Sequence, residues 1–100
     1  MTTIEFQRVA RALADPQRLA ILERIAAEAG EMPCKRLVQE ASVSQATISH
    51  HLRELNEAGL IESRRAAQCV YLSLRRETIA AYSRELARRM ATNLAPPPSD

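Results

Sequence analysis

Residues 44–60 read Ser-Gln-Ala-Thr-Ile-Ser-His-His-Leu-Arg-Glu-Leu-Asn-Glu-Ala-Gly-Leu, and this stretch decides the fold. Ile48, Leu52 and Leu55 recur at helical spacing, so one stripe of the predicted helix is apolar and buried. The opposite face carries short polar side chains and one long charge, whereas a merely solvated helix usually carries Glu and Lys. Short polar groups let a helix backbone lie deep in the major groove of DNA and reach base edges. This pattern predicts a recognition helix whose outer face consists of Gln45, Ala46, Ser49, His50 and Arg53.

The composition indicates one helical domain. The chain has 100 residues, of which 46% are hydrophobic and 3% aromatic, a balance that allows one core and favours helices over sheet. The net charge is only +2, and the basic excess falls in the half that holds the predicted recognition helix. No apolar run reaches the ~18 residues of a membrane helix, and charges interrupt the N-terminal segment, which excludes a secretory leader. Two cysteines without a leader predict reduced thiols in a soluble, cytoplasmic protein.

Local signals predict five helices and one β-hairpin. Asp15-Pro16 is a start signal, an acidic N-cap followed by Pro at the first helical position, and Gly30 is a stop. Ser44 caps the recognition helix and Gly59 ends it. Met32-Pro33 is expected to open a short helix. The predicted helices cover residues 3–13, 16–29, 34–40, 45–58 and 77–93, and the predicted strands cover 60–64 and 69–74, joined by a four-residue tip at 65–68.

This order of elements predicts a mainly α fold with a small β-hairpin. Two helices joined by a short turn form a helix-turn-helix, and the hairpin after them is a wing. The chain is thus expected to be a winged helix-turn-helix with flanking N- and C-terminal dimerisation helices. We assign residues 1–94 to this domain and residues 95–100 to a disordered, Pro-rich tail.

Two motifs resemble the arsenic-repressor-like (ArsR/SmtB) family of bacterial transcriptional regulators. They are Asp-Pro-x-Arg-Leu-x-Ile-Leu at residues 15–22 and Ser-Gln-x-Thr-x-Ser-His-His-Leu-x-x-Leu-x-x-Ala-Gly-Leu at residues 44–60. The resemblance extends from residue 3 to about residue 93. It implies a homodimer, formed by the first and last helices, that binds a palindromic operator and usually represses transcription.

The metal sites of this family do not carry over to the chain. The resemblance leads us to expect Cys-x-Cys on the third helix, where only Cys34 is present. The zinc site on the family's last helix uses Asp, His and Glu, but this helix offers only Glu77 and Glu85. We therefore predict no metal and no cofactor, and we expect a thiol-based or a signal-independent mechanism in place of divalent-metal sensing.

Further DNA contacts are predicted around the recognition helix. The hydroxyl group at its N-terminus lies where the helix dipole and free amides attract phosphate. The hairpin tip can follow the backbone or enter the minor groove, although a solvated turn is the simpler interpretation. These added candidates are Ser44 and Thr47 at the helix start, Arg64, Arg65 and Gln68 at the tip, and Lys35 and Arg36 on the third helix.

The cysteines and the terminal helices carry two further hypotheses. Cys34 and Cys69 are either ordinary packing residues or a thiol sensor, the latter because cationic neighbours and a helix start would lower the pKa of Cys34. An apolar stripe on the last helix either covers the core or pairs with a second copy. We expect pairing, which supplies the two half-sites of a palindrome. The predicted dimer residues are Ile4, Val9, Ile79, Tyr82, Leu86 and Met90.

The sequence therefore predicts a regulator that binds double-stranded DNA sequence-specifically, as a dimeric repressor released from its operator by a small inducer or by thiol modification. The alternative is a winged-helix protein-interaction module that does not read DNA. That use would need an apolar or acidic outer face, which Gln45, Ser49, His50 and Arg53 do not provide. The sequence has no phosphate loop, catalytic constellation or metal-ligand cluster, so we do not expect an enzyme.

Overall fold

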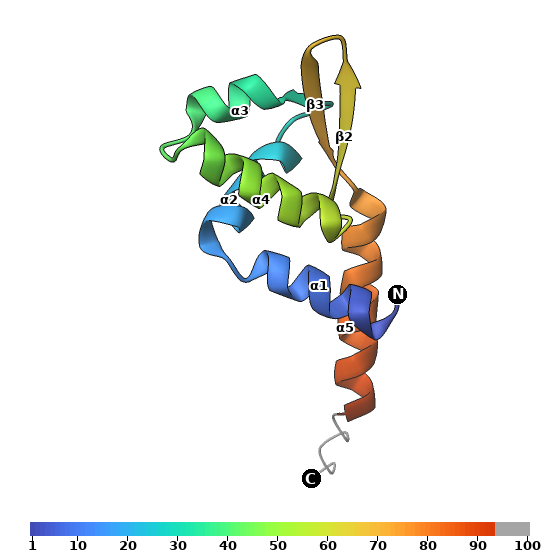
Figure 1. Ribbon diagram of the computed structural model, residues 1–100. Helices are drawn as coiled ribbons and strands as arrows, with labels where there is room; N and C mark the ends of the chain where they lie inside the picture. Colours follow the sequence, from blue (N-terminus) through green and yellow to red (C-terminus); the bar gives the residue numbers. More distant parts are fainter. Residues whose placement is uncertain (94–100) are drawn as a thin grey trace.

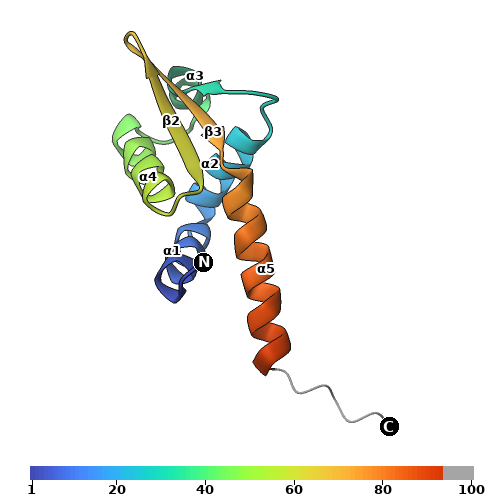
Figure 2. The same cartoon turned by 90° about the vertical axis from the view of Figure 1, so that its right-hand side faces the viewer.

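The computed structural model describes residues 1–93. Figures 1 and 2 show three helices packed beside a β-hairpin, with the first and last helices side by side below them. The predicted tail, residues 95–100, and the boundary at residue 94 lie outside the described residues. The elements are α1 (Thr3–Leu13), α2 (Pro16–Ala26), β1 (Met32–Pro33), α3 (Cys34–Glu40), α4 (Gln45–Glu57), β2 (Ile61–Ala66), β3 (Cys69–Leu74) and α5 (Arg76–Asn93). The predicted fold class, a mainly helical winged helix-turn-helix, is confirmed.

Side chains at the helix starts fix where three helices begin. Thr2 and Glu5 form a reciprocal capping box at α1, with bonds of 2.7 and 3.1 Å. Asp15 accepts a hydrogen bond from the amide of Arg18 at α2, and Ser44 accepts one from the amide of Thr47 at α4. Each bond satisfies an amide that the first helical turn leaves without a partner. The predicted starts at residues 3, 16 and 45 are therefore confirmed.

The sheet contains a strand that the sequence did not reveal. Its order is β1-β3-β2, all antiparallel, with Met32 opposite Leu72 and Pro33 opposite Tyr71. The predicted helix over residues 34–40 is confirmed, with Pro33 as its N-cap. The strand before it was missed, because a strand of two residues has no detectable periodicity. The same pairing explains why α2 ends at Ala26 and not at residue 29: the chain must turn to bring Met32 to the sheet.

The hairpin is longer and its tip tighter than predicted. Ala66 pairs with Cys69, so only Ala67 and Gln68 form the tip, where four residues were expected. Ala67 has φ of 55°, the positive value that a two-residue hairpin requires at its first central position. Glycine is the usual residue at such a position, so the two-residue turn could not be predicted from Ala67.

The core lies between α2, α4 and the sheet. Ile25, Ile48, Leu55, Leu60 and Leu72 are all less than 2% exposed. The apolar stripe predicted on the recognition helix is therefore buried, and α4 is held against the domain along its length. No helix within residues 1–93 combines the length and the apolarity needed to cross a lipid bilayer.

The turn after α4 rests on one glycine. Leu60 N–H donates to the Leu55 carbonyl and Gly59 N–H to the Asn56 carbonyl, each at 3.0 Å, the pattern of a Schellman cap. Gly59 has φ of +74°, and an added Cβ would lie 3.9 Å from Oγ1 of Thr78. A side chain here would therefore meet backbone strain but no steric clash.

We expect Gly59→Ala to lower the free energy of unfolding by about 1–2 kcal/mol, because a residue with a Cβ is disfavoured in the left-handed region. Gly30→Ala is the matched control, since its added Cβ has nothing within 4 Å and its φ is not positive. Urea unfolding followed by circular dichroism compares the two variants. Equal stability of the two would contradict the proposed role of the cap.

The N-terminal part of α1 is clamped onto α5. Phe6 stacks on Tyr82 with ring centroids 5.0 Å apart, and the Arg89 guanidinium lies 4.3 Å from the centroid of the Phe6 ring.

A hydrogen bond from Arg88 is the main reason that the pKa of Glu85 falls to about 2; partial burial opposes the shift, and a bond from Arg89 adds to it. Because the pKa of Glu85 is lower in the folded state, its bonds to the arginines stabilise the fold at pH values above the ordinary pKa of a glutamate. This stabilisation is lost as the pH falls toward 2.

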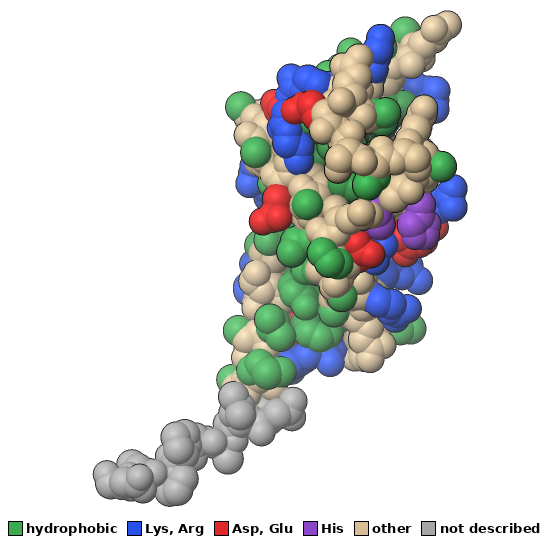
Figure 3. Space-filling model, turned by 90° about the vertical axis from the view of Figure 1, so that its left-hand side faces the viewer, with side chains coloured by type: hydrophobic (Ala, Val, Ile, Leu, Met, Phe, Trp, Pro, Cys, Tyr) green, Lys and Arg blue, Asp and Glu red, His purple; other side chains and the backbone are tan. Residues whose placement is uncertain are grey.

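The predicted dimer residues divide into two groups. Val9 is 1% exposed and lies in the core, so its assignment to a dimer surface was wrong. Ile79 and Tyr82 are partly buried against the same core. Three of the six remain exposed: Ile4 at 70%, Leu86 at 40% and Met90 at 46%. Figure 3 shows hydrophobic side chains gathered on the lower half of one face, at the height of α1 and α5 in Figure 1.

Candidate nucleic-acid interface

The outer face of α4 is exposed as the sequence predicted. Gln45, Ala46, Ser49, His50 and Arg53 are all exposed, while the stripe on the opposite side is buried. Arg53 has no carboxylate partner among residues 1–93. The face therefore offers amide, hydroxyl and imidazole groups with one cation unpaired within those residues, on a helix whose other side is fixed to the core.

The start of α4 carries two hydroxyl groups beside the helix N-terminus. The Ser44 hydroxyl oxygen accepts from the amide of Thr47 at 3.1 Å and lies 2.9 Å from the Thr47 hydroxyl oxygen. The helix dipole adds positive potential here. Capping and the predicted position beside an anion are compatible, because the capping bond leaves the remaining acceptor and donor capacity of these hydroxyls free.

A buried histidine joins α4 to the first two helices. His51 is 5% exposed, its Nδ1 lies 3.5 Å from Nη1 of Arg18, and its Nε2 lies 3.3 Å from Oε1 of Gln17. The guanidinium can only donate, so Nδ1 accepts and Nε2–H donates to Gln17. Arg18 also donates from Nε to the carbonyl of Ala12 at 2.8 Å and from Nη2 to the carbonyl of Arg11 at 3.4 Å.

The sequence analysis missed Gln17 and Arg18 as residues that position α4. His51 itself lies on the packed side of α4. Nothing in the local sequence identifies which residues of α2 meet the imidazole, because the contact joins residues more than thirty positions apart. The available signal was Arg18 itself. It is a long charged side chain three residues after the N-cap Asp15, in a helix whose other regularly spaced residues are apolar.

The wing is tied to the end of α4. The Asn56 side-chain amide donates to the Leu52 carbonyl at 3.1 Å and to the Ser63 hydroxyl at 3.0 Å. Ser63 belongs to β2, and its hydroxyl donates back to Oδ1 of Asn56 at 3.2 Å. Residues two apart on a strand share a face, so Arg65 lies on the side of the hairpin that Ser63 turns toward α4.

The two arginines of the wing have different surroundings. Arg64 donates two hydrogen bonds to Glu31, at 2.7 and 2.8 Å, and lies 4.9 Å from the centroid of the Tyr71 ring. This pairing lowers the pKa of Glu31 and raises the pKa of Arg64. Arg65 has no carboxylate partner in the described part of the chain. Of the three candidate DNA contacts predicted on the wing, Arg64 is thus paired with a carboxylate of the chain, while Arg65 and Gln68 are exposed at or beside the tip.

A similar division separates the two cations of α3. Arg36 forms ion pairs with Glu28 and Glu40, which also bind Arg24. Lys35 is exposed and forms no ion pair within residues 1–93. The positive charge of Arg36, a predicted DNA contact, is therefore neutralised by carboxylates of the chain.

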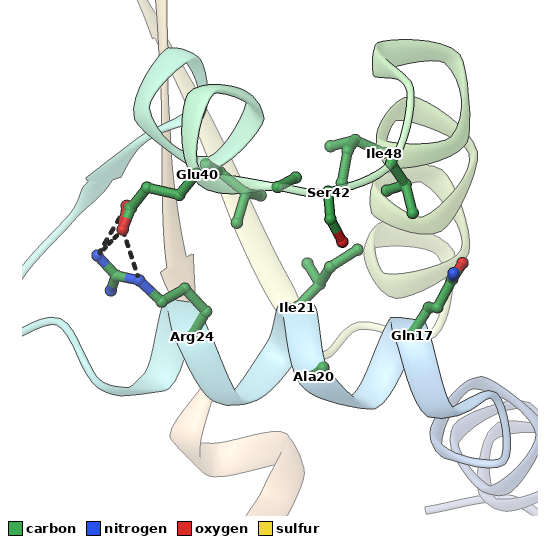
Figure 4. Close-up of a pocket in the computed structure, with 10 residues that line it drawn as sticks. Gln17, Ala20, Ile21, Arg24, Glu40, Ser42 and Ile48 are labelled. Carbon is green, nitrogen blue, oxygen red and sulfur yellow. Dashed lines mark hydrogen bonds and ion pairs between the residues drawn. The ribbon is translucent and has the colours of Figure 1, made fainter.

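Figure 4 shows the Arg24–Glu40 pair at the edge of a pocket of about 370 Å³ beside the α3–α4 turn. Ile21, Ser42 and Ile48 also line this pocket.

The two cysteines have different surroundings. Burial raises the pKa of the Cys34 thiol, and the side chain packs against the core. The predicted low pKa was therefore wrong, because burial disfavours the charged thiolate. Cys69 is exposed and, by strand alternation, lies on the face of β3 opposite the buried Leu72. Within the described residues, no three His, Cys, Asp or Glu side chains gather as metal ligands.

The chain is similar to known regulators. A family model described as a helix-turn-helix domain matches residues 13–64. Transcriptional repressor SdpR of Bacillus subtilis (strain 168) is 35% identical over 66% of this chain and 71% of its own length. The structure of an ArsR-like transcriptional regulator from Rhodococcus sp. RHA1 superposes with a TM-score of 0.80 at 26% identity, covering 89% of this chain and 82% of that one.

A second solved structure shares the arrangement of the flanking helices. It is the homodimeric winged helix-turn-helix DNA-binding domain Mb0332 from Mycobacterium bovis, a possible ArsR-family regulator, solved by NMR in solution. The TM-score is 0.68 at 26% identity, with 96% of this chain and 87% of that chain covered. The resemblance thus extends from the helix-turn-helix to both terminal helices.

Proposed function

Because the chain belongs to the ArsR family of winged helix-turn-helix transcriptional regulators, we propose that it represses transcription by binding a palindromic operator as a homodimer. Members of this family bind DNA and are not enzymes. The proposed partners of this chain are double-stranded DNA and a second copy of the chain. It acts in the cytoplasm, the compartment that holds the operator.

One observation carries the proposal: the exposed face of α4 carries mainly short, polar side chains, while the opposite face of the helix is packed against the core. Gln45 and Ser49 are suited to base edges in the major groove, and Ala46 lets the backbone approach closely. His50 and Arg53 lie on the same face and extend it. A protein-interaction module would need an apolar or acidic surface here, and this face has neither.

The surrounding residues are suited to the DNA backbone. Ser44 and Thr47 lie at the positive end of α4, where phosphate binds favourably. Within residues 1–93, Arg65, Gln68 and Lys35 are exposed without carboxylate partners and supply the wing and α3 contacts. Arg64 and Arg36 are left out, because their charges are neutralised by carboxylates of the chain.

Selection from a library of random duplexes tests the function. The expected result is enrichment of a two-fold symmetric sequence whose half-sites lie about 10 bp apart, as two α4 helices in successive major grooves require. Footprinting should show a dimer covering both half-sites. Failure to enrich any sequence, with the folded chain present, would contradict sequence-specific DNA binding.

Release from the operator by a small inducer or by thiol modification completes the proposal. The thiol branch rests on Cys69, which is exposed near the wing tip, rather than on Cys34. Modification of Cys69 would place a new group on the strand that forms the wing, beside Ala66. Operator binding by Cys69→Ser that resists oxidant or arsenite would support this branch.

Iodoacetamide at neutral pH is expected to alkylate Cys69 several times faster than Cys34, because Cys69 is exposed and burial raises the pKa of Cys34. Mass spectrometry of peptides taken over time measures both rates in one sample. Faster alkylation of Cys34 would contradict the raised pKa and support the thiolate that the cationic neighbours of Cys34 suggest.

A further inference from the structure

The arginines of this chain fall into two classes. In the described part of the chain, several are held by carboxylates: Arg24, Arg36, Arg64, Arg75, Arg88 and Arg89. Others have no carboxylate partner there. Two of these lie on α1, outside the helix-turn-helix, and both are exposed: Arg8 and Arg11. An exposed guanidinium without a counter-charge remains available for an external anion.

The C-terminal end of α1 lies next to the recognition helix. A single side chain, Arg18, binds the carbonyls of Arg11 and Ala12 and also reaches Nδ1 of His51. The ring of His50, on the exposed face of α4, lies with its centroid 5.5 Å from that of His51. The backbone at Arg11 is thus connected through Arg18 to His51, whose neighbour His50 lies on the exposed face of α4.

The surface view agrees with this placement. In Figure 3 acidic side chains lie just below the histidines, and Lys and Arg side chains follow along the same edge of the molecule, at the height that α1 occupies in Figure 1. Arg8 lies one turn before Arg11 and lines the hollow between α1, α5 and the end of α4. Of the two α1 cations, Arg11 is the one whose backbone Arg18 joins to His51 of α4.

We propose that Arg11 binds a phosphate of the operator and extends the DNA interface beyond the helix-turn-helix and the wing. A duplex whose major groove receives α4 presents the phosphates that border that groove to the end of α1. The interaction is a charge-assisted hydrogen bond to the backbone, so it adds affinity and orientation but no sequence preference. This inference rests on the proposed function, because it requires DNA on the face of α4.

Arg11 also lies in the last turn of α1, where a cation stabilises the helix dipole. A purely structural role would lower the melting temperature of Arg11→Ala, which removes the cation, and leave the salt dependence of DNA binding as it is. Arg84 is the matched control. It is an exposed arginine of α5, without a carboxylate partner in residues 1–93, on the side of the helix opposite the Leu86–Met90 stripe.

The experiment measures the dissociation constant of the full chain for a random-sequence 30-bp duplex and for the selected operator at several salt concentrations. Arg11→Ala is expected to weaken binding several-fold on both duplexes and to reduce the slope of log K against log[salt] by about 0.9 for each phosphate that Arg11 neutralises. Arg11→Lys should retain the slope, and Arg84→Ala should match the parent protein. The preference for operator over random duplex should stay unchanged in all variants.

An Arg11→Ala slope and affinity equal to those of Arg84→Ala would overturn the inference while leaving the proposed function intact. A parent protein that binds neither duplex would overturn the proposed function itself. If Arg11→Ala lowers stability, Arg11→Gln, which keeps the aliphatic stem, replaces it in the same assay. A parent-like slope in Arg11→Gln would then overturn the inference.

Discussion

Replacing Gln45 or Ser49 by Ala is expected to weaken operator binding by roughly 1–3 kcal/mol for each base that the side chain reads, a factor of about 5 to 150 in the dissociation constant. The same variants should show a weaker sequence preference, because binding to random duplex depends on phosphate interactions that neither residue makes. Both side chains are exposed on a helix whose opposite face is buried, so their removal leaves the core unchanged. Competition between operator and random duplex measures both effects.

Ser83→Ala is the control for Ser49→Ala, since Ser83 is an exposed serine of α5, outside the helix-turn-helix and the wing. It should bind the operator like the parent protein. If Gln45→Ala and Ser49→Ala both kept the parent's operator preference, base reading would have to be assigned to another element, and the wing would be the next candidate.

The double variant Leu86→Glu, Met90→Glu is expected to be a monomer at micromolar concentration and to bind the operator about 100-fold more weakly, or worse. Both side chains are exposed and apolar on α5, at 40% and 46%, and a dimer would bury the introduced charges without partners. A monomer also loses the gain from engaging two half-sites at once, which amounts to a factor of about 10² or more. Analytical ultracentrifugation and operator titration measure the two effects.

Leu19→Glu provides the matched control. Leu19 is a leucine of α2 with almost the same exposure as Leu86, 38% against 40%, but it lies outside α1 and α5. The variant should remain a dimer. Dissociation caused by Leu19→Glu, or a stable dimer of the Leu86→Glu, Met90→Glu variant, would show that the chain pairs through a surface other than the terminal helices.

Features set by neighbouring residues could be predicted from the sequence. Asp15-Pro16 and Ser44 place helix starts correctly, because each cap forms within one turn. The two faces of α4 follow from helical periodicity, and Gly59 marks its end because the cap needs a positive φ. These are the elements that bring the outer face of α4 to the surface, so the main part of the candidate site was predictable.

Features set by distant residues could not be predicted. The pairing of Arg64 with Glu31 and of Arg36 with Glu28 decides which cations remain available, and each partner lies on another segment. A lowered pKa was one of the two alternatives for Cys34, because its neighbours in sequence are cationic, yet the side chain packs against the core and burial raises its pKa. Val9 was expected at a dimer surface, but the fold places it in the core.

The position of DNA on α4 is the central claim, and an NMR titration of the chain with the selected operator tests it most directly. We expect the largest amide shift changes over residues 44–53, with smaller changes at the wing tip, 65–68, and at the end of α1. Amides in the middle of α5 should stay unchanged beyond the uniform effect of a larger complex. Saturable operator binding with the main shift changes on α5 or on α2, and none over residues 44–53, would contradict the claim.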